Sequence, residues 1–184
     1  MKEVLIALAN EGIKPVGGND NEVLFDEGYE TYEFYNAILS AVKERLYIFG
    51  RKNRKLFTRN NTKLKELLEN KLDFKCLFLS DKASSSILKI AQDNDNFEED
   101  LNKVIGSVKE RYTDYLTCFR KYDFQQLKRI IILDDVVIYA PVEFEMGNVK
   151  HFTKSKFVIY SIDNTKAIEL IHEFNKIWDI SKEI

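Results

Sequence analysis

Short apolar runs alternate along this chain with segments whose apolar residues recur every three or four positions. The apolar runs predict strands buried on both faces, because a half-exposed strand would alternate polar and apolar residues. The strands expected on this basis are 46–50, 74–80, 130–133, 136–139 and 157–162. The other periodicity predicts amphipathic helices. The expected helices cover 2–11, 34–42, the leucines of 64–68, a long segment from 97 to 119, and a final segment that ends the chain. Together these elements predict an α/β fold with a layered mixed sheet flanked by helices.

The strongest local pattern is the stretch from Leu127 to Phe144, which predicts a hairpin. An aliphatic run breaks at Asp134-Asp135 and then resumes. Adjacent aspartates between apolar runs are typical of a turn, since Asp tolerates tight dihedrals and bonds its own backbone. The stretch is therefore interpreted as a hairpin whose strands are buried on both faces.

The segment from 46 to 80 reads as strand, helix, strand, which favours a parallel pair with a right-handed crossover. Before it, Gly12 stands where a helix C-terminal cap is expected. The glycines of 17–21 lack the lysine-serine pair and the third glycine of a phosphate-binding loop, so this segment is interpreted as a loop. Residues 1–30 thus form a helix-and-loop lead-in to the sheet.

Length and composition are those of an ordinary globular chain. The 184 residues are 45% hydrophobic and 32% charged, and they predict one domain spanning 1–184. A net charge of -2 gives no global attraction to polyanions, so anion binding has to be local. Two cysteines support neither a disulfide scaffold nor a cysteine-rich metal site, and we expect no metal and no cofactor. Without a run of membrane length or a signal-peptide pattern, we expect a cytoplasmic protein with no membrane contact.

Basic and hydroxyl side chains follow the two strands of the expected parallel pair. Loops beyond the carboxyl ends of parallel strands form ligand crevices, and helix N-termini suit anions. The sequence therefore predicts a phosphate or anion pocket, with a solvated basic surface as the alternative reading. The candidate residues are Arg51, Lys52 and Arg54 after the first strand, and Ser80, Lys82 and Ser84 after the second.

The order of elements and the hairpin resemble one half of a phospholipase D-like protein, whose active stretch reads H-x-K-x4-D-x6-G-S-x-N. Aligning Asp134 with the motif aspartate puts Arg129 at the lysine position and Leu127 at the histidine position. Pro141, Val142 and Phe144 then occupy the Gly, Ser and Asn positions. The resemblance extends to phospholipase D-like modules without the histidine motif that occur in bacteria, some fused to DNA-binding regulators.

This resemblance implies a scaffold that has lost its nucleophile, since leucine can neither attack phosphorus nor transfer a proton. Arg129 could still bind phosphate in bidentate fashion, and Asp134 would be a second remnant of the site. The implied protein is a non-catalytic module that binds a phosphorylated small molecule or nucleotide, or mediates regulatory assembly as a homodimer. Nucleic acid as a partner is left open.

Two alternatives remain. One is an active phosphodiesterase or nuclease with a rearranged site built from His151, Lys154 and Asp134. The other is an interaction protein that uses Tyr29, Tyr32 and Tyr35 as an aromatic surface, although aromatics at such spacing more often lie in a core.

Overall fold

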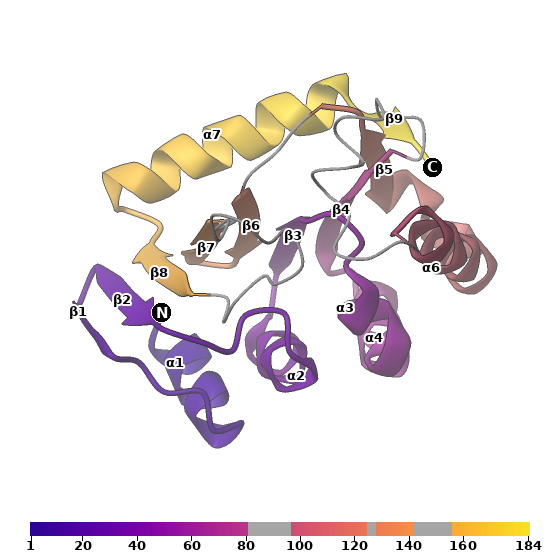
Figure 1. Ribbon diagram of the computed structural model, residues 1–184. Coiled ribbons are helices and arrows are strands. Elements are labelled where there is room, and N and C mark those ends of the chain that lie inside the picture. The colour runs from indigo at the N-terminus through magenta and orange to yellow at the C-terminus, as the bar shows by residue number, and fades with distance from the viewer. Residues whose placement is uncertain (81–96, 125–127, 142–155) are drawn as a thin grey trace, which may run out of the picture.

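A nine-stranded mixed sheet forms the centre of the computed structural model, which describes residues 1–80, 97–124, 128–141 and 156–184. The strand order is β1-β2-β8-β7-β6-β3-β4-β5-β9 (Figure 1). The strands are β1 (Gly17–Asn19), β2 (Glu22–Phe25), β3 (Arg45–Phe49), β4 (Asp73–Leu79), β5 (Phe119–Tyr122), β6 (Lys128–Leu133), β7 (Val136–Pro141), β8 (Phe157–Ser161) and β9 (Lys182–Glu183).

Helices cover both faces of the sheet, so the predicted α/β class with a mixed sheet flanked by helices is confirmed (Figure 1). In Figure 1 α7 lies across one face, and α1, α2, α3, α4 and α6 lie on the other. The described helices are α1 (Lys2–Asn10), α2 (Tyr32–Ala41), α3 (Arg54–Arg59), α4 (Asn61–Glu69), α6 (Phe97–Arg111), the 3₁₀ segment η1 (Thr113–Cys118) and α7 (Thr165–Ile180).

The β6–β7 hairpin lies in the middle of the sheet. Ile130, Ile131 and Ile132 are fully buried, because helices cover both faces of these strands. Leu133 pairs with Val136, so the two aspartates form the connecting turn. The buried hairpin and its aspartate turn are confirmed.

The direction of the strands determines which ends share an edge of the sheet. β3 pairs in parallel with β4, and β4 pairs in parallel with β5. β6 runs antiparallel to β3, with Phe49 opposite Ile130. The carboxyl ends of β3, β4 and β5 therefore lie at the same edge as the amino end of β6, and the expected parallel pair is confirmed.

Three local expectations were wrong. Residues 17–21, expected as a loop, contain β1, whose backbone pairs with β2 in a hairpin closed by the Asn19 side chain. The long helix expected to reach Phe119 ends at Arg111, and Phe119 instead begins β5 opposite Cys76. The final helix is followed by β9, which pairs with β5. In each case sheet pairing between distant segments overrides the local pattern.

Candidate functional site

The turn after β3 has a backbone held by the neighbouring strands. Asn53 has a φ of 49°, in the left-handed region, and its amide donates to the Leu77 carbonyl of β4 at 3.1 Å. The Tyr122 hydroxyl of β5 donates to the Gly50 carbonyl at 3.0 Å. Only glycine fits at position 50, since a Cβ there would lie 2.0 Å from Asn53 Oδ1. These contacts fix residues 50–53 at the edge of the sheet.

A cavity of about 220 Å³ opens between this turn and the start of α2. Below the roughly 300 Å³ at which pockets for drug-sized ligands begin, it suits a small ion or a single anionic group. Its lining residues are Glu30, Tyr35, Arg51, Lys52, Asn53, Arg54 and Lys55. The cavity therefore brings together three of the predicted site residues, Arg51, Lys52 and Arg54.

Some of this basic charge is balanced by α6. Lys52 Nζ lies 3.4 Å from an Asp100 carboxylate oxygen, and Arg54 Nη1 lies 3.0 Å from the same oxygen. The Lys52 ammonium also lies over the Phe97 ring, 4.7 Å from its centroid, a favourable cation–π position. Asp100 thus orients two of the lining cations, and the cavity keeps an excess of positive groups.

Arg129 lies beside the cavity, on the amino end of β6. It is buried, with 5% of its surface exposed. Its Nη1 lies 3.3 Å from a Glu30 carboxylate oxygen, and its guanidinium lies 5.6 Å from the centroid of the Tyr29 ring. Because Glu30 also lines the cavity, Arg129 is paired with a residue of the cavity wall.

Tyr35 places a protonated hydroxyl in the same region. The residue is 1% exposed, and its hydroxyl has no hydrogen-bond partner among the described residues. Burial raises the pKa of Tyr35 well above its usual value, and the charge of Glu30 raises it further while Arg129 opposes the shift. The phenol therefore remains a neutral donor at neutral pH, beside a cavity lined by cations.

The other residues predicted after the second strand are only partly described. Ser80 is buried at the same edge of the sheet, with its backbone N–H donating to the Tyr122 carbonyl at 2.6 Å, and it does not line the cavity. Lys82 and Ser84 lie outside the described residues, as does Leu127.

Asp134 lies at the opposite edge of the sheet from Arg129. The two residues are five positions apart on one strand, a separation of about 17 Å. The Asp134 carboxylate accepts the backbone N–H groups of Lys43, Glu44 and Arg45 at 2.9, 3.0 and 2.9 Å. Pairing Asp134 with Arg129 in one pocket was therefore wrong, because a β-strand places its two ends at opposite edges. Asp134 instead holds the connection between α2 and β3.

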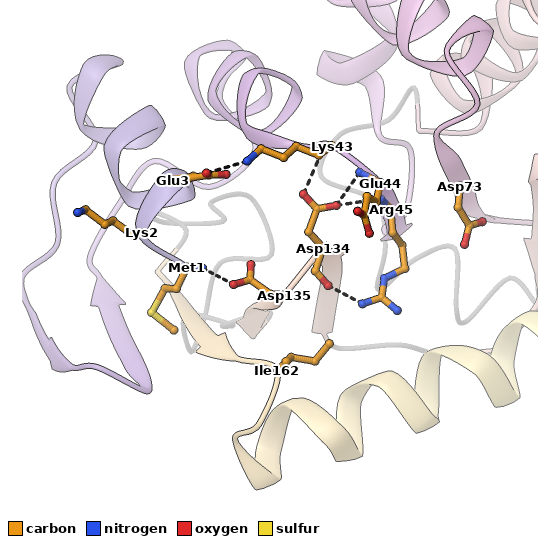
Figure 2. Close-up of a pocket in the computed structure, with 10 residues that line it drawn as sticks. All are labelled: Met1, Lys2, Glu3, Lys43, Glu44, Arg45, Asp73, Asp134, Asp135 and Ile162. Carbon is orange, nitrogen blue, oxygen red and sulfur yellow. Dashed lines mark hydrogen bonds and ion pairs between the residues drawn. The ribbon is translucent and has the colours of Figure 1, made fainter.

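A larger cleft of about 880 Å³ opens at this opposite edge (Figure 2). Figure 2 shows the Asp134 carboxylate directed at the backbone of Lys43, Glu44 and Arg45, and Lys43 paired with Glu3. Carboxylates are at least as numerous as cations among its lining residues, so it carries no excess of positive charge. The smaller, basic cavity at the other edge is for this reason the candidate anion site.

The three tyrosines do not form one aromatic surface. Tyr29 and Tyr35 are buried, and their rings belong to a cluster around Phe34. Tyr32 is partly exposed, with the Arg59 guanidinium 4.0 Å from its ring centroid. The aromatic-surface hypothesis is thus wrong for Tyr29 and Tyr35, because the apolar face of α2 and the turn before it pack into the core.

The structure describes only one of the three residues of the rearranged catalytic site, so that hypothesis stays a prediction. His151 and Lys154 lie outside the described residues, and the Asp134 carboxylate is occupied by backbone donors. In the described part of the chain, no group of three or more His, Cys, Asp or Glu side chains is arranged to hold a metal ion. Nor does any described helix combine the length and apolar character needed to cross a membrane.

Four residues of the cavity were not among the predicted site residues: Glu30, Tyr35, Asn53 and Lys55. Lys55 belongs to the same basic run as Arg54, and this run is the sequence signal for it. Glu30 and Tyr35 lie in an acidic, aromatic segment that carries no recognisable anion-binding pattern. Packing of α2 against the sheet brings them to the turn after β3.

Comparison with known proteins gives structural relatives only. No family model and no curated protein sequence matches the chain. TrmBL2, an archaeal chromatin protein whose structure shows a novel mode of DNA binding, is similar over 100% of this chain with a TM-score of 0.56 and 13% identity. The chain spans 60% of the length of TrmBL2. At this identity the likeness concerns the fold alone.

Two further solved structures align at lower scores. Nuc from Salmonella typhimurium, a phospholipase D family member, has a TM-score of 0.39 and 11% identity over 80% of this chain and 86% of its own. NucT from Helicobacter pylori has a TM-score of 0.47 and 11% identity over 89% of this chain and 98% of its own.

Proposed function

We propose that this chain is a non-catalytic module that binds a small phosphate- or sulfate-bearing ligand in the cavity between residues 51–55 and α2. The observation that carries the proposal is the buried hydroxyl of Tyr35, which lacks a partner among the described residues and belongs to a residue that lines the cavity together with four cations. A buried polar group without a partner is costly, so its retention is explained by a ligand that accepts its hydrogen bond.

The charges around the cavity support an anion. Arg51, Lys52, Arg54 and Lys55 line it, with Glu30 as the one carboxylate among the lining residues. Arginine guanidinium groups suit the planar, bidentate recognition of oxyanions. Two lining residues, Glu30 and Asn53, have positive φ values of 59° and 49°. Such backbone strain in residues other than glycine is concentrated at functional sites.

The phospholipase D-like resemblance is part of the same proposal. Arg129 takes the position of the motif lysine, so a cation is retained there. Leu127 takes the position of the motif histidine, so the nucleophile is missing there. Binding without phosphoryl transfer follows, because leucine cannot form the covalent intermediate.

Homodimerisation and a cytoplasmic location remain predictions. Sedimentation of the purified chain tests homodimerisation.

Sulfate titration by isothermal calorimetry tests the site. Tyr35→Phe removes one hydrogen bond to the anion, worth about 1.5 kcal/mol or more, so sulfate should bind about tenfold more weakly. The same change should leave the ligand-free protein as stable as the parent or more so, because it removes an unpartnered buried hydroxyl.

Arg51→Gln should also weaken sulfate binding, through loss of a lining cation. Lys176→Gln is the matched control, since Lys176 is exposed on α7, across the sheet from the cavity. Equal sulfate binding in the parent, Tyr35→Phe, Arg51→Gln and the control would rule out the proposed site.

A nucleic-acid strand is a second candidate source of the phosphate, favoured by the charge of residues 51–65. This segment holds seven lysines and arginines and no aspartate or glutamate, although the whole chain has a net charge of -2. Arg54, Lys55, Arg59 and Lys65 are exposed on α3 and α4. TrmBL2, which shares the fold, is described as binding DNA. A row of exposed cations beside an anion pocket suits a phosphate backbone.

Fluorescence polarisation with labelled single-stranded and duplex DNA distinguishes a nucleic-acid strand from a small phosphate- or sulfate-bearing ligand. Backbone binding should weaken steeply between about 50 and 200 mM salt, and Lys55→Gln with Arg59→Gln should reduce the slope by about two counterions. Lys176→Gln should leave the slope unchanged. Sulfate binding without measurable DNA binding would leave the small ligand as the function.

A further inference from the structure

The turn before α2 constrains the backbone at Glu30. Glu30 has a φ of 59°, a conformation that residues other than glycine rarely adopt. On one side of it, Gly28 has a φ of 106°, and a Cβ there would meet the Ile13 side chain at 3.0 Å. On the other, the Thr31 hydroxyl donates to the Gly28 carbonyl at 3.0 Å and accepts from the Phe34 N–H at 3.0 Å. The carboxylate of Glu30 is thus presented by a constrained turn.

This carboxylate separates Arg129 from the cavity. Glu30 lines the cavity and Arg129 does not, yet the two side chains lie 3.3 Å apart. The Arg129 side chain is 6% exposed and that of Glu30 is 26% exposed. A buried guanidinium needs a compensating negative charge, and Glu30 supplies one from the side on which a ligand would enter.

We propose that Glu30 is an internal competitor for the anion. In the free protein the Glu30 carboxylate pairs with the Arg129 guanidinium, and a bound oxyanion takes the place of this carboxylate. This inference rests on the proposed function and assigns a regulating residue to the same site. Glu30 has room to leave, because its side chain already borders the cavity and is only partly buried.

The competition determines which anions bind well. A monovalent anion that replaces the Glu30 carboxylate gives Arg129 one negative charge in exchange for another, so it gains nothing over the free protein. A divalent oxyanion restores that charge and also attracts Arg51 and Lys52, which line the same cavity. The site should therefore discriminate in favour of sulfate and phosphate over formate and chloride, and removal of the Glu30 charge should reduce this discrimination.

Glu30→Gln tests the proposal, because it removes the charge and keeps the side-chain shape and the backbone conformation. Asp26→Asn is the matched control, since it makes the same charge change at an exposed residue four positions earlier that does not line the cavity. In sulfate titrations by calorimetry, Glu30→Gln should bind sulfate about tenfold more tightly than the parent, a change of about 1.4 kcal/mol. Formate binding should become measurable in Glu30→Gln, and Asp26→Asn should match the parent.

A thermal melt in sulfate separates this role from simple structural support. Glu30→Gln should melt below the parent without sulfate, because Arg129 loses the negative charge that Glu30 places beside it, and sulfate should restore the melting temperature. If Glu30→Gln does not fold, Glu30→Gly removes the same charge and also relieves the positive φ. Its sulfate affinity should likewise exceed that of the parent.

The outcomes distinguish this inference from the proposed function. Sulfate binding that is unchanged or weaker in the Glu30 variants, but is still lost in Arg51→Gln, would overturn the competitor role and leave the anion site in place. Absence of sulfate binding in the parent and in every Glu30 variant would overturn both. Sulfate binding in a Glu30 variant but not in the parent would support the competitor directly.

Discussion

Replacing Asp134 with asparagine separates a structural role of the motif aspartate from a role in binding. Asp134 Oδ1 accepts from the backbone N–H groups of Glu44 and Arg45, and Oδ2 accepts from that of Lys43. Asparagine can keep the first two bonds with its oxygen, but its amide nitrogen then faces the Lys43 N–H. Asparagine also tolerates the φ of 45° at this position, so the backbone cost is small.

The expected loss follows from these three bonds. One bond disappears, at about 1 kcal/mol, and the two remaining bonds lose the charge of their acceptor, at about 0.5 kcal/mol each. The total of about 2 kcal/mol corresponds to a decrease of about 4–8 °C in melting temperature for a chain of this size. Asp135→Asn is the control, because the Asp135 side chain is 68% exposed. Asp135→Asn should lower the free energy of unfolding by less than about 0.5 kcal/mol.

Urea unfolding followed by circular dichroism, together with sulfate titration, gives the result. Asp134→Asn should lower the urea midpoint with an unchanged m-value and should leave sulfate affinity at the parent level. A variant as stable as the parent that no longer binds sulfate would refute the structural assignment, and would return Asp134 to the ligand site.

Three further predictions concern the site, the pH dependence and the core. Gly50→Ala should lower stability and sulfate affinity together in the same two assays, because its Cβ would displace the Asn53 side chain. Burial raises the pKa of Tyr29 and Tyr35 above the ordinary tyrosine value. Their stabilising contribution is therefore complete below the ordinary tyrosine pKa of about 10, so the urea midpoint should fall progressively as the pH rises above about 10. Ile131→Ala, in the fully buried hairpin, should cost about 2–5 kcal/mol in urea unfolding without changing the sulfate affinity of the folded fraction.

The sheet could be predicted wherever a strand is buried on both faces, because its sequence is then a continuous apolar run. Ile130 to Leu133 is the clearest case. The periodicity from Phe97 onward continues past the end of α6, since Phe119 is buried by β-pairing instead of helix packing. An apolar residue in the sequence indicates burial, but it does not tell whether a helix or a strand buries it.

The site was predictable only in part. Arg51 and its neighbours follow a parallel strand, and the rule that such loops share an edge identifies them from sequence. Glu30 and Tyr35 reach the same cavity through long-range packing that no local pattern encodes. The spacing between Arg129 and Asp134 suggested one site, but five residues of extended strand put them at opposite edges of the sheet.

Diffraction from crystals grown with selenate would show directly whether an oxyanion binds in the cavity, because selenium gives an anomalous signal and selenate has the shape and charge of sulfate. We expect a selenate in the cavity beside Tyr35 and the Arg51 and Lys52 side chains. An empty cavity, with selenate bound only elsewhere on the molecule, would contradict this expectation.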